Sequence, residues 1–324
     1  ADLEVIVPVG FPELNVQIQP MAERNGISTY GDVQSLQFNI TSAGNDVIDG
    51  QEGDDRISGE TGDDIVIGGD GNDTLSGESG RDQLSGGTGN DAITGGTEND
   101  ILTGGEGKDF MEGGDGDDIL YFDDQDILVD GGEGIDIALL EDSATGQIVD
   151  TRAIQNVEFI GLSAADDTVI LDQTNDYVMD GGAGWDVLDG STASGLNITL
   201  DETVTDTKSI VNFEEVIGSG YSDTILGNNQ DDMISAGAGN DSVSGNAGDD
   251  TIRGESGDDA LSGQAGSDSL FGGGGQDTLA GGEGNDPLYF DAEDHLIDGG
   301  SDEDRAVLTG SDPGMAIESD RFQN

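Results

Sequence analysis

A nine-residue repeat runs through two long stretches of this chain and limits what it can fold into. Nine units fill 41–121 and eight fill 218–289, each a version of Gly-Gly-x-Gly-x-Asp-x-apolar-x. Position six is aspartate and position eight is aliphatic or methionine in all seventeen units. Position four departs from glycine only at Glu98, Tyr221 and Gln230. Such a regular period predicts a solenoid in which each unit packs on its neighbours.

The spacing within one unit indicates its local structure. One apolar residue in nine cannot form the apolar face of a helix, which needs three or four in two turns. It fits a very short strand whose middle side chain points inward and whose neighbours point outward. The glycines ahead of it supply a turn with positive φ and exposed carbonyls. We therefore expect parallel strands that stack with a thin aliphatic ladder between two sheets, and aspartate turns along both edges.

The charge of the chain restricts its partners. It carries 71 Asp and Glu against 9 Lys and Arg, for a net charge of −62, and only 33% of its residues are apolar. Such a composition is typical of disorder unless cations neutralise the carboxylates. The same field excludes nucleic acid and disfavours anionic lipid. No apolar run approaches the ~18 residues of a membrane span, so membrane insertion is not expected. Flexible oxygen donors without cysteine favour calcium over a transition metal.

The nonapeptide closely resembles that of the RTX (repeat-in-toxin) family of calcium-binding proteins. The resemblance implies an all-β fold, a parallel β-roll (a right-handed β-solenoid) with two nonapeptides per coil. It also implies calcium ions between successive turns on one edge, roughly 13 in number. Family members leave bacteria unfolded through a type I exporter, which implies a secreted, extracellular or cell-surface protein.

The ligands that the resemblance implies are the position-six carboxylates and carbonyls of the glycine turns. The predicted carboxylate ligands are Asp46, Asp55, Asp64, Asp73, Asp82, Asp91, Asp100, Asp109, Asp118, Asp136, Asp186, Asp223, Asp232, Asp241, Asp250, Asp259, Asp268, Asp277 and Asp286. The predicted carbonyl ligands belong to Gly53, Gly62, Gly69, Gly71, Gly87, Gly89, Gly105, Gly107, Gly248, Gly257, Gly266, Gly273, Gly275 and Gly282. Where position four is not glycine, we expect a weak or missing site.

A longer duplication, of 168 residues, organises the whole chain. GGDGDDILYFDDQDILVDGG at 113–132 recurs as GGEGNDPLYFDAEDHLIDGG at 281–300. The predicted organisation is an N-terminal cap or the end of a preceding domain at 1–40, an array at 41–121, a longer-coil segment at 122–217 with single repeats at 131–139 and 181–189, an array at 218–289, and the truncated start of a second longer-coil segment at 290–324. We expect the Tyr-Phe pair after each array to seal the end of the aliphatic ladder.

No residues of this sequence indicate catalysis. The one histidine, His295, falls opposite an isoleucine in the duplication, and no zinc-protease, serine-hydrolase or P-loop motif is present. We expect no enzyme activity within this chain. Two functions stay open: a calcium-folded module that gives a larger secreted or surface protein its secretion, stability and rigidity, and a module attached to a secreted enzyme such as a protease, lipase or alginate epimerase. Polysaccharide and other rolls stay open as partners, with Trp185 as one exposed aromatic.

Overall fold

The parallel β-roll expected from the nonapeptides is confirmed by the fold. The computed structural model describes residues 37–39, 44–171, 177–201, 209–309 and 322–323. Across these residues the chain is all-β with parallel strand pairing, apart from the short 3₁₀ helix η1 (Thr151–Ala153). It divides into two units. Unit 1 holds Ala1–Glu141 and Ala153–Gly161, and unit 2 holds Asp142–Arg152 and Leu162–Asn324.

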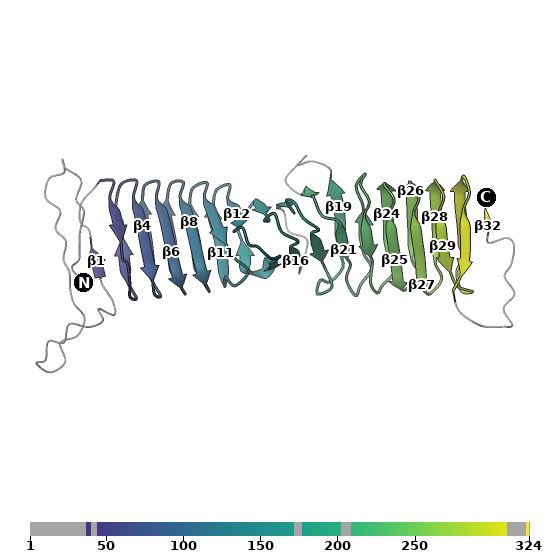
Figure 1. The fold of residues 1–324 in the computed structure, drawn as a ribbon, viewed down its shortest axis with the longest axis horizontal. Coiled ribbons are helices and arrows are strands. Elements are labelled where there is room, and N and C mark those ends of the chain that lie inside the picture. Colours follow the sequence, from purple (N-terminus) through teal and green to yellow (C-terminus); the bar gives the residue numbers. More distant parts are fainter. Residues whose placement is uncertain (1–36, 40–43, 172–176, 202–208, 310–321, 324) are drawn as a thin grey trace, which may run out of the picture. The chain divides into compact units, whose positions relative to one another are not determined.

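Unit 1 contains two parallel sheets, with consecutive strands of the array alternating between them (Figure 1). One sheet has the order β1 (Gln37–Asn39), β3 (Arg56–Ser58), β5 (Thr74–Ser79), β7 (Ala92–Thr97), β9 (Phe110–Asp115), β11 (Leu128–Glu133) and β14 (Ile154–Gln155). The other has the order β2 (Val47–Asp49), β4 (Ile65–Asp70), β6 (Gln83–Gly89), β8 (Ile101–Gly107), β10 (Ile119–Phe122), β12 (Ile137–Leu140) and β15 (Phe159–Gly161).

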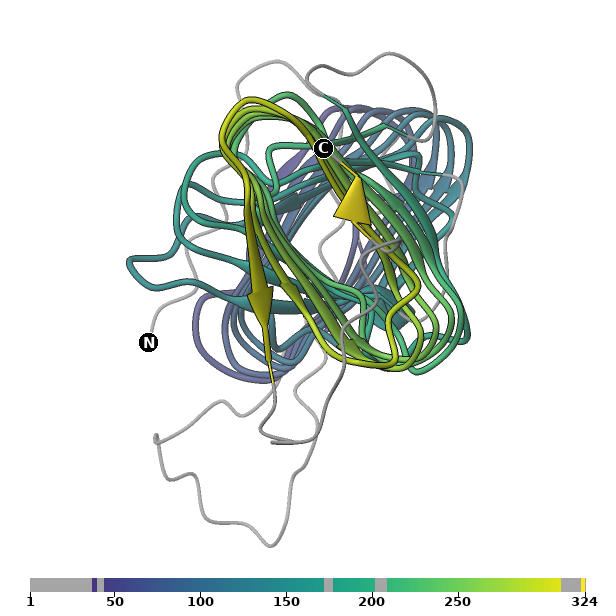
Figure 2. The same cartoon turned by 90° about the vertical axis from the view of Figure 1, so that its right-hand side faces the viewer.

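Unit 2 is built in the same way, and its green-to-yellow coils overlie one another in the end view of Figure 2. One sheet has the order β13 (Ile148–Asp150), β16 (Thr168–Ile170), β18 (Val187–Asp189), β21 (Glu215–Ile217), β23 (Met233–Ser235), β25 (Thr251–Ser256), β27 (Ser269–Gly274), β29 (Pro287–Phe290) and β31 (Arg305–Leu308). The other has the order β17 (Val178–Asp180), β20 (Ile210–Val211), β19 (Asn197–Asp201), β22 (Thr224–Leu226), β24 (Ser242–Ala247), β26 (Ala260–Ala265), β28 (Thr278–Glu283), β30 (Leu296–Ser301) and β32 (Phe322–Gln323).

Strand register shows the length of each coil. In the arrays a residue pairs with the one 18 positions later, as Ile65 does with Gln83, so each coil holds two nonapeptides. Coils outside the arrays are longer. Leu188 pairs with Val216, 28 residues on. The 168-residue duplication also recurs in the pairing, because β11 pairs with β14 at the same positions at which β30 pairs with β32.

The core of each array is the single file of position-eight side chains. They are at most 6% exposed, from Ile48 at the start of the first array to Leu288 at the end of the second. Strand alternation places the residues on either side of them outward. The prediction that both residues of each Tyr-Phe pair seal the ladder is wrong for tyrosine. Phe122 and Phe290 are buried, whereas Tyr121 is 36% exposed because its strand position faces outward.

The coils between the arrays have a larger core. We call residues 162–235 of unit 2 the bridging segment, which includes the first two nonapeptides (218–235) of the second array. Among its 62 described residues fifteen apolar side chains are buried, against seven in the 54 residues of 236–289. Phe213 is the largest of these fully buried side chains. The bridging segment therefore buries about twice as much apolar side chain per residue as the array that follows it.

Some expectations fall where the structure gives no description. The predicted N-terminal cap lies outside the described residues except for β1, and so does most of the chain after Thr309 except for β32. The segment boundaries read from the sequence stay predictions. Among the described residues, no helix has the length and apolar character needed to cross a bilayer.

Candidate metal centres

The position-six aspartates line up in stacks along the turns of the coils. In fifteen of the nineteen predicted carboxylate ligands, Oδ1 accepts a hydrogen bond from the backbone N–H of the aspartate one coil earlier. The N–H of Asp55 donates to Asp73 at 2.7 Å, and the N–H of Asp241 donates to Asp259 at 2.9 Å. Eighteen of the nineteen predicted carboxylate ligands are at most 3% exposed, and Asp46 is half-buried. In most turns one carboxylate oxygen is therefore used to join consecutive coils.

The second carboxylate oxygen of most of these aspartates is buried and has no hydrogen-bond donor among the described residues. Oδ2 is in this state at Asp64, Asp73, Asp82, Asp91, Asp100, Asp118, Asp136, Asp186, Asp241, Asp250, Asp259, Asp268 and Asp286. A buried polar atom without a partner costs on the order of 1–3 kcal/mol, and more when it is charged. A repeated feature of this cost needs a compensating ligand.

The glycine at position one lies directly against this Oδ2 atom. A Cβ on Gly68, at position one, would collide with Oδ2 of Asp73 and would lie 2.6 Å from the carbonyl oxygen of Gly86. A Cβ on Gly254 would collide in the same way with Oδ2 of Asp259. Position one is therefore glycine because the position-six carboxylate folds back over it.

All fourteen glycines predicted to offer carbonyls have left-handed backbone, with φ between 97° and 143°. At position four the carbonyl of Gly71 points at Gly89 of the next coil, where a Cβ would collide with it. Position two is also left-handed at most of its non-glycine residues in the arrays, as at Glu60 and Asn246. Its carbonyl is used in the stack, because Glu60 accepts from the N–H of Ser79 at 3.0 Å.

Burial raises the pKa of the stacked carboxyls, and the next carboxylates in the stack raise it further, although the hydrogen bond from the preceding coil lowers it. The pKa of Asp64 reaches about 6, and the pKa values of Asp100 and Asp250 reach about 7. Without metal, these buried carboxyls therefore bind protons at a higher pH than exposed aspartates do. A divalent cation at the same oxygens would remove that cost.

Position five forms a second ladder that the sequence reading missed. Its side chains are exposed and accept from the position-five N–H of the following coil. The N–H of Asn72 donates to Asp54 at 2.8 Å, and the N–H of Asn90 donates to Asn72 at 2.9 Å. In the position-six ladder the N–H donates to the following coil, whereas in the position-five ladder the N–H donates to the preceding coil. The frequent Asn and Asp at position five is the signal that could have revealed it.

Residues outside the nonapeptides continue the aspartate stacks, and these were also missed. Oδ1 of Asp126 accepts from the N–H of Asp109 at 3.0 Å, and Asp294 accepts from the N–H of Asp277 at 3.1 Å. Oε2 of Glu214 accepts from the N–H of Asp186 at 2.8 Å, and Glu158 takes the same place beside Asp136 in unit 1. The shared FDxxD sequence and the shared Asn-x-Glu sequence of the closing motifs were the available signals.

Three turns of the bridging segment differ from the array turns because protein donors reach the second oxygen. Oδ2 of Asp167 accepts from both the N–H and the hydroxyl of Ser163, at 3.1 and 2.7 Å. Oδ2 of Asp223 accepts from the N–H of Ser219 at 2.6 Å. Oδ2 of Asp232 accepts from the N–H of Asn228 at 2.9 Å. The donors occupy position two of their own repeats.

We call these three closed turns, and the turns with an unpartnered Oδ2 open turns. Position-two residues of the closed turns are not left-handed, unlike Asn246 at position two of an open turn, whose φ is 80°. Position four also differs. Glu98 keeps a left-handed φ of 78° and its turn is open, whereas Tyr221 and Gln230 are not left-handed and their turns are closed. The three position-four departures are therefore not equivalent.

The open turns fit calcium by the chemistry of their donors. Calcium accepts about six to eight oxygen ligands from carboxylates and carbonyls in flexible geometry. Each open turn offers a buried carboxylate oxygen and a glycine turn with exposed carbonyls. Among the described residues no three acidic, histidine or cysteine side chains meet in a way that alone could hold a metal. Backbone carbonyls must therefore supply much of any coordination shell.

This fold and these turns define a β-roll with repeated oxygen-donor sites. The model of the RTX calcium-binding nonapeptide repeat matches residues 40–66, 58–93, 67–102, 94–126, 217–252 and 253–286. The chain therefore belongs to the RTX family, and multiple calcium ions are its cofactor. A search among curated proteins finds no match.

Proposed function

We propose that this chain is an extracellular module that calcium folds into a rigid roll, and that it serves as a spacer and stabilising element in a larger secreted or surface protein. The observation that carries the proposal is the row of buried Oδ2 atoms without donors in the open turns. In each open turn Oδ1 joins two coils, and Oδ2 with the glycine carbonyls would hold the ion.

The size of the calcium contribution supports a folding switch. A site that binds only the folded chain stabilises it by about 1.4 kcal/mol when calcium is tenfold above the dissociation constant. Extracellular calcium modules bind at about 10⁻⁴ to 10⁻³ M. About ten such sites together match the whole stability of a typical domain, roughly 5–15 kcal/mol. The contribution disappears at the calcium concentrations found inside cells.

The charge and the duplication support the role of the roll outside the cell. A net charge of −62 keeps the calcium-free arrays extended by self-repulsion, and bound cations reduce it. The 168-residue duplication repeats an array followed by longer coils, and such repetition of one unit suits a spacer.

Circular dichroism of the full chain tests the switch. We expect the β-sheet signal of the arrays to be lost when calcium is removed by a chelating resin, and to return at millimolar calcium. Magnesium is the matched control, because it demands a small octahedral shell and keeps its water, so the same concentration should restore little signal. An unchanged β-sheet signal in the calcium-free chain, with no calcium uptake in calorimetry, would contradict the proposal.

A further inference from the structure

Every buried carboxylate in the roll has to be neutralised or hydrogen-bonded, and the two kinds of turn do this differently. In an open turn the protein supplies one hydrogen bond to Oδ1. In the turn of Asp223 the N–H of Leu196 donates to Oδ1 at 2.6 Å, the N–H of Ser219 donates to Oδ2, and the hydroxyl of Ser219 donates to Oδ1 at 2.9 Å. Both oxygens are satisfied by the protein itself.

The turn of Asp167 is closed to the same extent. The N–H of Gln147 donates to its Oδ1 at 2.8 Å, and Ser163 donates twice to its Oδ2. Ser163 and Ser219 are 5% and 3% exposed, so these hydrogen bonds are shielded from water. The turn of Asp232 is closed at Oδ2 only, since its Oδ1 has no donor among the described residues.

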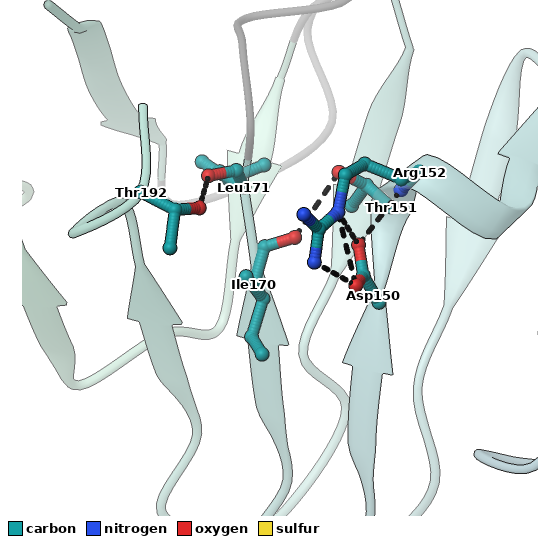
Figure 3. Close-up of polar contacts among 6 residues, drawn as sticks. All are labelled: Asp150, Thr151, Arg152, Ile170, Leu171 and Thr192. Atoms are coloured by element: carbon teal, nitrogen blue, oxygen red, sulfur yellow. Dashed lines mark hydrogen bonds and ion pairs between the residues drawn. The ribbon is translucent and has the colours of Figure 1, made fainter. Parts of the chain in front are cut away.

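Other turns of this part of unit 2 are also held by side chains. The hydroxyl of Thr151 donates to the carbonyl of Ile170 at 3.1 Å, and the hydroxyl of Thr192 donates to the carbonyl of Leu171 at 3.3 Å (Figure 3). Arg152 forms an ion pair with Asp150 beside them. The arrays have similar contacts at single places, because Nδ2 of Asn246 donates to the carbonyl of Gly227 at 2.8 Å and Arg81 forms an ion pair with Asp63.

We propose that the bridging segment folds without calcium and is the permanent template on which calcium assembles the second array. This inference rests on the proposed function, since it divides the roll into calcium-dependent and calcium-independent coils. Its closed turns place serine and asparagine donors at the oxygens that calcium serves elsewhere. Its core buries about twice the apolar side chain per residue, which supplies the stability that calcium supplies in the arrays. Asp186 is the one fully open turn inside it.

The position of the closed turns along the chain gives the template its role. The turns of Asp223 and Asp232 lead directly into β22 and β23. These strands pair with β24 and β25, the first strands that follow the bridging segment in either sheet. In a folded bridging segment, β22 and β23 therefore form the edge strands to which β24 and β25 can pair. The first array coil can add to both edges without forming a new nucleus, which is the slow step in ordering repeats.

Hydrogen exchange of the full chain with mass detection tests the template. In EGTA we expect peptides within 209–235 to exchange about a hundredfold more slowly than peptides within 245–271, and calcium to protect only the latter. Equal, fast exchange of both in EGTA, with calcium protecting both, would overturn the inference and leave the proposed function standing. If calcium protects neither peptide, the proposed function itself fails.

A pair of substitutions tests the chemistry of the closed turns. The double variant Ser219→Gly with Tyr221→Gly restores a glycine turn before Asp223. We expect it to bind one more calcium ion in equilibrium dialysis and to lose the slow exchange of 209–235 in EGTA. Glu98→Gly is the matched control, because its turn is already open, and its calcium count should not change. An unchanged calcium count in the double variant, with exchange in EGTA as slow as in the parent, would overturn the inference.

Discussion

The second array and the bridging segment that precedes it use the same stacked aspartates with opposite consequences. In the array, Asp259 gives one oxygen to the preceding coil and leaves the other buried without a donor. In the bridging segment, Ser219 fills the corresponding place beside Asp223. The difference teaches that an aspartate in the repeat frame does not always have an oxygen left without a protein donor. The backbone conformation at position two distinguishes the turns in which a protein N–H reaches Oδ2 from those in which none does.

The largest expected effect that separates the two regions is that of pH on the calcium-free chain. Burial raises the folded pKa of array carboxyls to about 7 at Asp250 and about 6 at Asp259, above about 3.9 in an unfolded chain. The folded array therefore binds more protons, so its stability increases as pH falls and is lost as pH rises through about 6–7. We expect the resin-treated chain to gain β-sheet signal between pH 8 and pH 5.

Hydrogen exchange measured at pH 8 and at pH 5 shows which part of the chain produces the gain in β-sheet signal. Peptides within 245–271 should become protected at pH 5 after correction for the intrinsic exchange rate, and peptides within 209–223 should change little. The pKa of Asp232 is also raised by burial, to about 6, so the peptide around it should gain some protection as well. A β-sheet signal that stays constant or increases with pH in the calcium-free chain would contradict the role of the buried carboxylates.

The next largest effect is expected from a substitution in the apolar core. Phe213→Ala should cost about 3–5 kcal/mol in the bridging segment, enough to abolish its calcium-free unfolding transition in urea. Trp185, the only tryptophan of the chain, lies in this segment and reports the transition by fluorescence. Leu270→Ala, in the array, is the matched control. It should leave the calcium-free transition unchanged and destabilise only the calcium-loaded chain. An equal effect of both variants without calcium would remove the distinction between the regions.

Removing one carboxylate from each region should have smaller effects, on calcium binding in the array and on calcium-free stability in the bridging segment. Asp259→Asn should lower the number of bound calcium ions by one or two and cost roughly 1–3 kcal/mol of calcium-dependent stability. Asp223→Asn should leave the calcium count unchanged, because its turn is closed, and should cost roughly 1–2 kcal/mol in the calcium-free transition through the lost hydrogen bond from Ser219. Equilibrium dialysis and urea unfolding measure both. A lower calcium count for Asp223→Asn would show that its turn binds an ion after all.

The smallest effect concerns strain at an open turn. Glu98 holds a φ of 78°, which glycine adopts without strain. Glu98→Gly should therefore stabilise the calcium-loaded chain by less than about 1 kcal/mol in urea unfolding. Glu106→Gly is the control at position three, where φ is not positive, and it should destabilise by about 0.5–1 kcal/mol. Destabilisation by Glu98→Gly would mean that its side chain contributes more than its backbone costs.

Much of the fold followed from the period of the sequence. A frame of nine with one inward aliphatic side chain permits only a strand and a turn, so the parallel roll, the buried position eight and the stacked aspartates could be predicted. The orientation within the Tyr-Phe pairs could have been predicted as well, because tyrosine follows the inward position eight and strand alternation turns it outward. The contributions of Asp126 and Glu214 were hidden because they enter the stack from coils of another length.

The nonapeptide itself determined that this chain is a calcium-binding roll, since every unit combines one inward aliphatic residue, which permits only a short strand, with a glycine-rich turn and a carboxylate. Only the tertiary structure decided which turns have an unpartnered oxygen. Asn228 and Asn246 stand at position two of the second and fourth nonapeptides of 218–289, yet only Asn228 donates its N–H to the aspartate of its own turn. The sign of φ at that residue follows from how the neighbouring coils pack, which no single repeat encodes.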